Sequence, residues 1–225
     1  KIVRVDSLKI AEFTKLLENI YRSVNIGLVN ELKIITDKMG IDVNKVIKAS
    51  STKPFGFEPF YPGPGLGGHC IPIDPYYLSW KLKTLDYDAR FIKLAGEINT
   101  QMPMHIVNII SSSLNEHQKS IKGSKVLIIG VAYKKNIDDI RESPALDIIQ
   151  ILQESGSEVD YFDPYVPKIK VGDLNLKSLK ELVKTGLIGY DAIAIVTNHI
   201  DIDYDLIRSN GKLIIDTRNV YHDSN

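Results

Sequence analysis

The first forty residues carry a regular pattern of apolar positions separated by polar ones. From about residue 8 to residue 39 the apolar side chains recur at steps of three and four, which predicts one long α-helix with an apolar stripe. Asp6 or Ser7 can cap this helix, and Gly40 ends it. The stripe consists of Ile10, Phe13, Leu17, Ile20, Val24, Leu28, Leu32 and Ile35. A helix of roughly 50 Å cannot bury such a stripe on itself, so we expect it to pack on helices of this chain or of a second copy.

The pattern is interrupted over residues 51–75, which contain six prolines and five glycines. This density of helix and strand breakers predicts a long loop, and a loop of this length inside a compact domain is usually functional. Helices are predicted on both sides of it, over residues 43–49 with Asp42 as the cap, 76–84, and 90–118 with Pro103 as a kink site.

The second half alternates short apolar runs with helical patterns. Strands are predicted over residues 125–130, 158–163, 191–197 and 212–216, and helices over 143–155, 176–185 and 204–209. This alternation predicts a parallel sheet covered by helices on both faces. The fold class is therefore α/β, with an all-helical domain over residues 1–119 and a Rossmann-like domain over 120–225.

Composition narrows the class of protein. The 225 residues are 44% hydrophobic, and 28 basic side chains balance 28 acidic ones, which argues against a general nucleic-acid binder. No run of 18 apolar residues is present, so we expect no membrane span. Cys70 is the single cysteine, which excludes an internal disulfide and favours the cytoplasm. The five histidines have no ligand spacing, so we expect no metal.

Two glycine segments invite a nucleotide interpretation. Gly63-Pro-Gly-Leu-Gly-Gly68 matches G-x-G-x-x-G, but the residues before it cannot form a central strand, so dinucleotide binding is disfavoured. A close backbone approach to a ligand and a simple tight turn both remain open. The turn after the first predicted strand has one glycine, Gly130. Asp163, at the end of the next strand, is either a ribose-binding acid or, as we favour, a turn residue before Pro164.

The cations near these turns suit a nucleoside diphosphate better than NAD. Lys134, Lys135 and Arg141 follow Gly130, and Arg218 follows the last strand, at the edge where ligands bind to such sheets.

Cys70 lies between the glycine segment and Asp74-Pro75, which has the form of an N-cap followed by a first-turn proline. A thiol near a helix N-terminus is a usable nucleophile, while a buried, inert cysteine is the competing interpretation. On the long helix Lys15, Asn19 and Arg22 share one face, which is either a site or an ordinary solvated surface.

Taken together, these segments resemble the UDP-glucose/GDP-mannose dehydrogenase family of nucleotide-sugar 6-dehydrogenases. Residues 11–31 are similar to its long central helix, and Tyr-Pro-Gly-Pro-Gly-Leu-Gly-Gly-His-Cys-Ile-Pro-Ile-Asp-Pro at 61–75 to its nucleophile loop. Residues 130–143 and 216–218 resemble its nucleotide-sugar domain. The sequence of residues 53–57 and of His69-Cys70 most resembles the branch of the family that acts on UDP-N-acetylhexosamines. Within that branch we expect UDP-N-acetylglucosamine as the substrate.

The resemblance implies three domains: an NAD-binding Rossmann domain, a helical dimerisation domain and a UDP-binding domain. No strand with G-x-G-x-x-G stands before the long helix. We therefore expect these residues to be the last two domains, with NAD bound mainly by the first. By themselves they should not reduce NAD.

The resemblance also implies a double oxidation of the sugar C6 alcohol to a uronate through a thiohemiacetal and a thioester. Cys70 would be the nucleophile, Lys15 and Asn19 would stabilise the oxyanion, and Asp74 would act as the base. Substrate-binding residues carried over are Phe60, Tyr61, Gly65, Gly67, Gly68, Tyr133, Lys134 and Arg218, and Arg141 is carried over as a cofactor contact.

Two other hypotheses remain at this stage. The chain could be a non-catalytic module that binds a UDP-sugar and dimerises through its long helix. It could also be an NAD protein that uses the sheet turn at Gly130.

Overall fold

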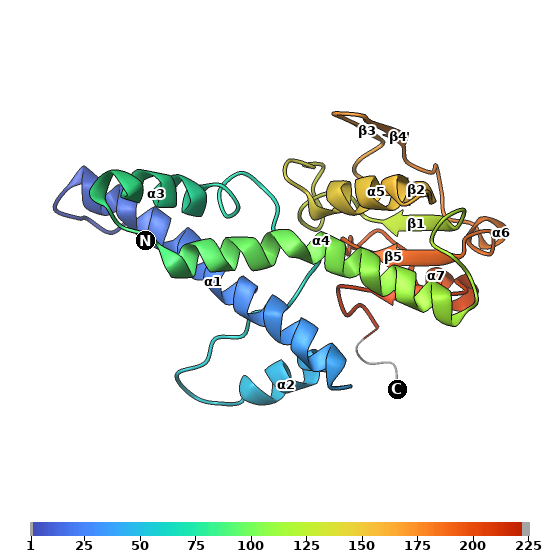
Figure 1. The fold of residues 1–225 in the computed structure, drawn as a ribbon, viewed down its shortest axis with the longest axis horizontal. Helices are drawn as coiled ribbons and strands as arrows, with labels where there is room; N and C mark the ends of the chain where they lie inside the picture. Colours follow the sequence, from blue (N-terminus) through green and yellow to red (C-terminus); the bar gives the residue numbers. More distant parts are fainter. Residues whose placement is uncertain (1, 222–225) are drawn as a thin grey trace. The chain divides into compact units, whose positions relative to one another are not determined.

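The computed structural model describes residues 2–221, apart from the side chain of residue 76. The helices are α1 (Leu8–Lys38), α2 (Val43–Ser50), α3 (Asp74–Leu82), the 3₁₀ turn η1 (Lys83–Leu85), α4 (Arg90–Glu116), α5 (Pro144–Glu154), α6 (Lys184–Leu187) and α7 (Tyr204–Asn210). The strands are β1 (Lys125–Ile129), β2 (Glu158–Phe162), β3 (Lys168–Val171), β4 (Leu174–Lys177), β5 (Ala192–Ile195) and β6 (Ile214–Asp216). Figure 1 shows their order along the chain.

The chain divides into two compact units. Unit 1 comprises residues 1–61 and 69–100, and unit 2 comprises residues 62–68 and 101–225. Helix α4 crosses from one unit into the other, and the short glycine segment 62–68 belongs to the unit that holds the sheet. The domain boundary at residues 119 and 120 stays a prediction.

Unit 1 is helical and is built on α1. Ser7 caps α1 by accepting from the Ile10 N–H at 3.3 Å, and Gly40, with φ of +67°, follows its end. Gly27 lets α4 approach closely, because a Cβ there would lie 3.2 Å from the Cα of Ala95. Nearby, buried Asn30 donates to the side chain of Asn99 at 2.9 Å, so a polar contact is enclosed where the two helices meet.

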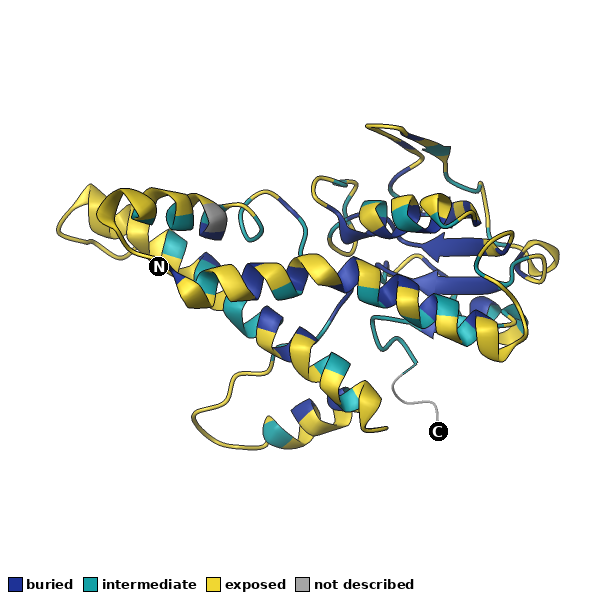
Figure 2. Cartoon of the chain, in the orientation of Figure 1, coloured by how far each residue is buried: buried dark blue, intermediate teal, exposed yellow. Residues whose placement is uncertain are grey.

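Unit 2 contains a four-stranded parallel sheet in the order β2-β1-β5-β6. Four of the five residues of β1 and all of β5 are buried, as expected for strands covered on both sides. Alternate residues face two separate clusters: Val126 and Ile128 pack with α4 and α5, and Leu127 and Ile129 pack with α6 and α7. The predicted doubly covered sheet is thus confirmed, and Figure 2 shows the two central strands, β1 and β5, as buried.

One predicted element is wrong. The helix expected over residues 176–185 is absent: residues 176–177 end strand β4 of an antiparallel β3–β4 hairpin, residues 178–183 form neither helix nor strand, and the short helix α6 begins at Lys184. The turn between the strands has Gly172 at φ +53°, and Ile169 and Leu174 are buried while their neighbours are exposed. This alternation has the period of a strand, and it extends to residue 177, into the start of the expected helix.

A second correction concerns the start of α3. Asp74 was expected as the N-cap, but the cap position is Ile73, without a side-chain hydrogen bond, and Asp74 is the first helical residue. The Asp74 carboxylate is engaged elsewhere, by side chains of α1, and is therefore not available to cap the helix.

Candidate functional site

Asp74 is the centre of a polar cluster in unit 1. Asn19 donates from Nδ2 to its Oδ2 at 2.7 Å, and the Lys15 ammonium lies 3.7 Å from the same oxygen. Lys15 and Asn19 are one turn apart on α1, so the helix presents both to one carboxylate. Asn19 is only 3% exposed, whereas Lys15 is largely exposed, which leaves its ammonium open to a ligand.

Arg22 continues this cluster along α1. It donates from Nη2 to the Asn19 Oδ1 at 2.9 Å and from Nε to the Glu18 carbonyl at 3.1 Å. Because an amide oxygen only accepts, this contact orients the Asn19 amide with its Nδ2 toward Asp74. The face predicted from the spacing of Lys15, Asn19 and Arg22 is therefore an organised polar cluster.

Cys70 stands one turn before Asp74. Its carbonyl accepts from the Asp74 N–H at 2.9 Å, and its thiol is free and partly exposed. Within residues 2–221 no hydrogen bond or ion pair joins this thiol to Lys15. The backbone thus ties the thiol segment to the carboxylate that Lys15 and Asn19 approach, and a thiol, an ammonium and a carboxylate come from two short segments of one unit.

Phe60 and Tyr61 also belong to unit 1. Phe60 packs edge-on against Tyr21, with ring centroids 5.7 Å apart, and joins a small core of Val29, Val43 and Ile47. Tyr61 is exposed. This packing leaves Phe60 partly exposed, and Tyr61 is the more accessible of the two.

The glycine segment packs against a turn of the sheet domain within unit 2. The Gly68 N–H donates to the Arg141 carbonyl at 3.0 Å. A Cβ on Gly67 or Gly68 would lie 2.6 or 2.8 Å from Tyr133, so both positions need glycine. Residues 57–62 form no strand, so the context required for dinucleotide binding is lacking. Gly65, with φ of +137°, lies half-buried in the same segment.

Arg218 follows β6 and also approaches the glycine segment. Its Nε donates to the Val196 carbonyl at 2.7 Å, and its Nη1 lies 2.7 Å from the place where a Gly63 Cβ would be. Burial lowers the pKa of Arg218 to about 10, and among residues 2–221 no carboxylate forms an ion pair with it. A partly buried guanidinium that pairs with no carboxylate among the described residues is chemically suited to binding an anion.

Asp163 is not a ribose-binding acid. Its carboxylate is fully buried and accepts from the N–H groups of Val131, Ala132, Tyr165 and Val166 and from His199. Burial raises its pKa, but the hydrogen bonds from His199, Val131 and Tyr165 outweigh burial and hold the pKa below its usual value. The turn interpretation is confirmed, since no oxygen of this carboxylate is left for a ligand.

His199 is a residue that the sequence reasoning missed. The spacing of the histidines in the sequence does not indicate its role, whereas its position shortly after β5 places it at the same sheet edge as Asp163. Following each parallel strand to its carboxyl end would have found it.

The remaining candidates are cations. Arg141 forms a two-pronged ion pair with Asp139, at 2.6 to 3.0 Å, and remains largely exposed, as does Lys134. Across residues 2–221 no three metal-ligating side chains converge. Within the same range, no helix is both long and apolar enough to span a bilayer.

Comparison with known proteins agrees with this geometry. Residues 9–101 match the central domain of the UDP-glucose/GDP-mannose dehydrogenase family, and residues 127–223 match its UDP binding domain. The chain belongs to this family.

Among relatives, UDP-N-acetyl-D-mannosamine dehydrogenase of Methanococcus maripaludis is 36% identical over 98% of this chain and 50% of its own length. UDP-N-acetyl-D-glucosamine 6-dehydrogenase of Pseudomonas aeruginosa is 39% identical over 72% of this chain and 38% of its own length. The structure of UDP-D-ManNAc dehydrogenase from Pyrococcus horikoshii superposes with a TM-score of 0.79 and 32% identity, over 93% of this chain and 48% of that one. The chain thus spans about half the length, or less, of the relatives it matches.

Proposed function

We propose that this chain supplies the chemical and UDP-binding parts of an NAD-dependent UDP-N-acetylhexosamine 6-dehydrogenase, which oxidises the C6 alcohol of the sugar to a uronate. The observation that carries the proposal is the cluster of Lys15 and Asn19 on the Asp74 carboxylate, one turn from the free Cys70 thiol. Relatives named for UDP-N-acetylmannosamine and UDP-N-acetylglucosamine support the substrate class, and our sequence-based preference remains the gluco sugar.

The residues of unit 1 act on C6. When the C6 aldehyde is present, the Cys70 sulfur adds to its carbonyl carbon and an oxyanion forms on the carbonyl oxygen. The Lys15 ammonium and the Asn19 amide stabilise that oxyanion by hydrogen bonding, and the Lys15 ammonium supplies the proton that neutralises it. At the thioester stage Asp74 accepts a proton from the attacking water, and the thiolate leaves as the uronate forms.

Removing hydride from C6 is the chemistry that NAD supplies when bound. The sheet of unit 2 does not fit this cofactor, because a Cβ on Gly130 would lie 2.1 Å from the Thr197 carbonyl oxygen and the Asp163 carboxylate is enclosed. The close approach of Thr197 to Gly130 leaves no space for a pyrophosphate at this turn. The enclosed Asp163 carboxylate cannot bind the ribose hydroxyls of a dinucleotide. Of the residues in this chain, we propose Arg141 as a contact to NAD, and we expect no NAD reduction by the 225 residues alone.

Unit 2 binds the nucleotide. The Arg218 guanidinium, partly buried beside Gly63 and without a carboxylate partner among residues 2–221, recognises the anionic diphosphate or the uracil carbonyls. Gly65, Gly67 and Gly68 offer backbone groups, and Tyr133 and Lys134 line the sugar and diphosphate. Tyr61 and Phe60 complete the proposed substrate contacts.

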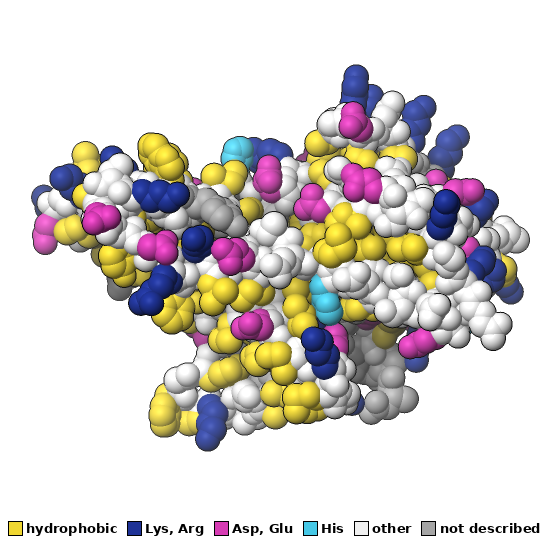
Figure 3. Space-filling model, viewed as in Figure 1, with side chains coloured by type: hydrophobic (Ala, Val, Ile, Leu, Met, Phe, Trp, Pro, Cys, Tyr) yellow, Lys and Arg dark blue, Asp and Glu magenta, His cyan; other side chains and the backbone are white. Residues whose placement is uncertain are grey.

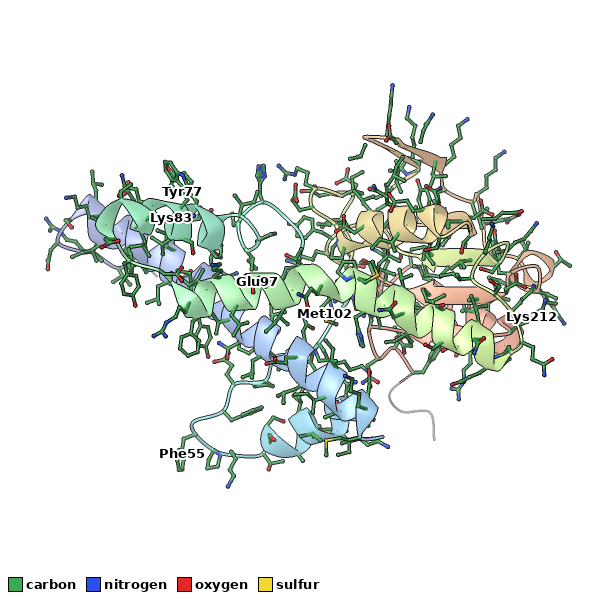
Figure 4. The ribbon with its side chains drawn as sticks, in the orientation of Figure 1. Phe55, Tyr77, Lys83, Glu97, Met102 and Lys212 are labelled. Carbon is green, nitrogen blue, oxygen red and sulfur yellow. The ribbon has the colours of Figure 1, made fainter. Side chains whose placement is uncertain are left out.

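We also propose that α1 forms a homodimer. Six residues of its predicted stripe are exposed, namely Ile10, Phe13, Leu17, Leu28, Leu32 and Ile35. Such a row is unfavourable in water and fits a second copy of the same helix. Figure 3 shows hydrophobic side chains among charged ones on the surface of this unit. In Figure 4 the side chains of Phe55 and Tyr77 point away from the ribbon, and they are 83% and 65% exposed.

The nucleophile can be tested without NAD, because adding a thiol to an aldehyde is not a redox step. The chain is mixed with UDP-N-acetylglucosamine carrying a ¹³C-labelled C6 aldehyde, and the thiohemiacetal carbon is followed by NMR. We expect its resonance in the native chain, none in Cys70→Ser and a weaker one in Lys15→Met. Lys33→Met, on the same helix but paired with Asp37, is the control. An unchanged resonance in Cys70→Ser would remove the proposed chemistry.

A further inference from the structure

A buried histidine joins two strand ends to a turn in unit 2. His199 is completely enclosed, its Nε2 lies 3.0 Å from the Asp163 Oδ2, and its Nδ1 lies 2.8 Å from the backbone nitrogen of Asn136. The Tyr165 ring covers it at 4.9 Å between centroids. None of these contacts takes part in the proposed chemistry, although they converge on the turn that carries Tyr133 and Lys134.

The hydrogen-bond partners fix the tautomer of this imidazole. The Asn136 N–H can only donate, so Nδ1 must present a lone pair. The ring proton is therefore on Nε2 and is donated to the Asp163 carboxylate. Because Asp163 also accepts from the N–H groups of Val131 and Ala132, the histidine and the aspartate contact the same turn at both ends.

Further contacts close the turn between these ends. Thr197 donates from Oγ1 to the Ala132 carbonyl at 2.6 Å, and the Asn136 Oδ1 accepts from the Ile200 N–H at 2.9 Å. Asn136 itself adopts φ of +62°, a conformation that needs fixed partners in a non-glycine residue. Tyr133 and Lys134 lie between the two anchored points, so their backbone positions depend on both.

We propose that His199 is a positioning residue for UDP-sugar binding: as the neutral Nε2–H tautomer it fixes the turn over residues 131–136 so that Tyr133 and Lys134 meet the diphosphate. This inference rests on the proposed function, because it assigns a purpose to the placement of those two side chains. If His199 had only a structural role, its loss would lower the stability of unit 2. It would not change the affinity for a ligand with a diphosphate relative to a ligand without one.

Two substitutions separate the contacts of His199. The amide oxygen of His199→Asn takes the place of Nδ1 and can still accept from Asn136, while the contact to Asp163 is lost. The terminal amide of His199→Gln takes the place of Nε2 and can still donate to Asp163, while the contact to Asn136 is lost. Leu152→Ala, a fully buried position in α5, is the control for a general loss of stability.

The first readout is hydrogen exchange of the Asn136 amide in the unliganded chain. We expect it to accelerate at least about tenfold more in His199→Gln than in His199→Asn, as for the loss of a direct hydrogen bond. The second readout is calorimetric affinity for UDP against uridine. His199→Gln should lose about tenfold for UDP and keep uridine binding, and His199→Asn and Leu152→Ala should keep the native ratio.

Equal exchange at Asn136 in the two histidine variants, or an unchanged ratio of UDP to uridine affinity in His199→Gln, would overturn the inference. If the native chain bound neither ligand, the proposed function would fail, and the exchange measurement would still decide whether His199 fixes the turn.

Discussion

At the scale of single residues, Asp163 carries a charge that five donors compensate inside unit 2. Its pKa is lower in the folded chain than the ordinary value of about 3.9. Such a carboxylate stabilises the fold above the unfolded-state pKa, and this stabilisation is lost as the pH falls through the folded-state pKa. Unit 2 should therefore lose stability below about pH 4.

Asp163→Asn tests this assignment. We expect the free energy of unfolding at pH 7 to fall by about 3 kcal/mol, because buried donors lose a charged acceptor. We also expect a flatter dependence on pH below 4. Urea unfolding between pH 7 and 3 measures both. Asp191, whose pKa is also lowered, is present in both proteins, and its contribution cancels in the comparison. Superimposable acid curves would contradict the assignment.

Gly130 lies at a position where any side chain would clash with the neighbouring backbone. It adopts φ of +77°, and a Cβ would lie 2.1 Å from the Thr197 carbonyl oxygen, whereas Gly172, at φ +53°, has open space. Gly172→Ala should cost about 1–2 kcal/mol of stability from backbone strain alone. Gly130→Ala should cost clearly more, since the backbone at Thr197, just after β5, must also move. Equal midpoints in chemical denaturation would show that the contact is unimportant.

Residue types alone left the roles of several residues open. The spacing of Lys15, Asn19 and Arg22 predicted a shared helix face, but only the structure brings the Asp74 carboxylate to it. Asp163 and His199 are 36 positions apart, and no local pattern joins them. Such a contact depends on which strand ends lie close together, and this is known only once the strand order of the sheet is known.

At the scale of elements, the contact between α1 and α4 combines close packing with buried polarity. Asn99 accepts from Asn30 and donates to the Ser23 carbonyl at 3.1 Å. Asn99→Leu removes both contacts and should lower the free energy of unfolding by about 1–3 kcal/mol. Glu97→Ala, an exposed position on the same helix labelled in Figure 4, should change it little. Equal unfolding midpoints for the two variants would argue against a role for the asparagine pair.

The element boundaries also show what sequence periodicity can predict. Helix α1 was expected over about 8–39 and spans Leu8–Lys38, because its apolar stripe, its N-cap and its terminal glycine all agree. The β3–β4 hairpin was missed because its strands have four residues each, too few for their alternation to stand out. The Asp74 error arose because its carboxylate bonds to another helix, which local capping rules cannot detect.

At the scale of the whole molecule, the exposed row on α1 predicts self-association. Leu17→Glu places a charge in that row and should convert a dimer at micromolar concentration into a monomer in sedimentation analysis. Val171→Glu, at an exposed apolar position on the hairpin, is the matched control and should leave the dimer intact. A native chain that sediments as a monomer would refute the dimer.

The central proposal is that this chain binds uridine diphosphate through the Arg218 guanidinium, which pairs with no carboxylate among residues 2–221. Calorimetric titration of the native chain should give heat with UDP and none with NAD. Arg218→Met should abolish most of the UDP heat, whereas Lys212→Met, an exposed cation just before β6 (Figure 4), should not. Heat from NAD alone, or equal UDP affinity in Arg218→Met and the native chain, would contradict the account.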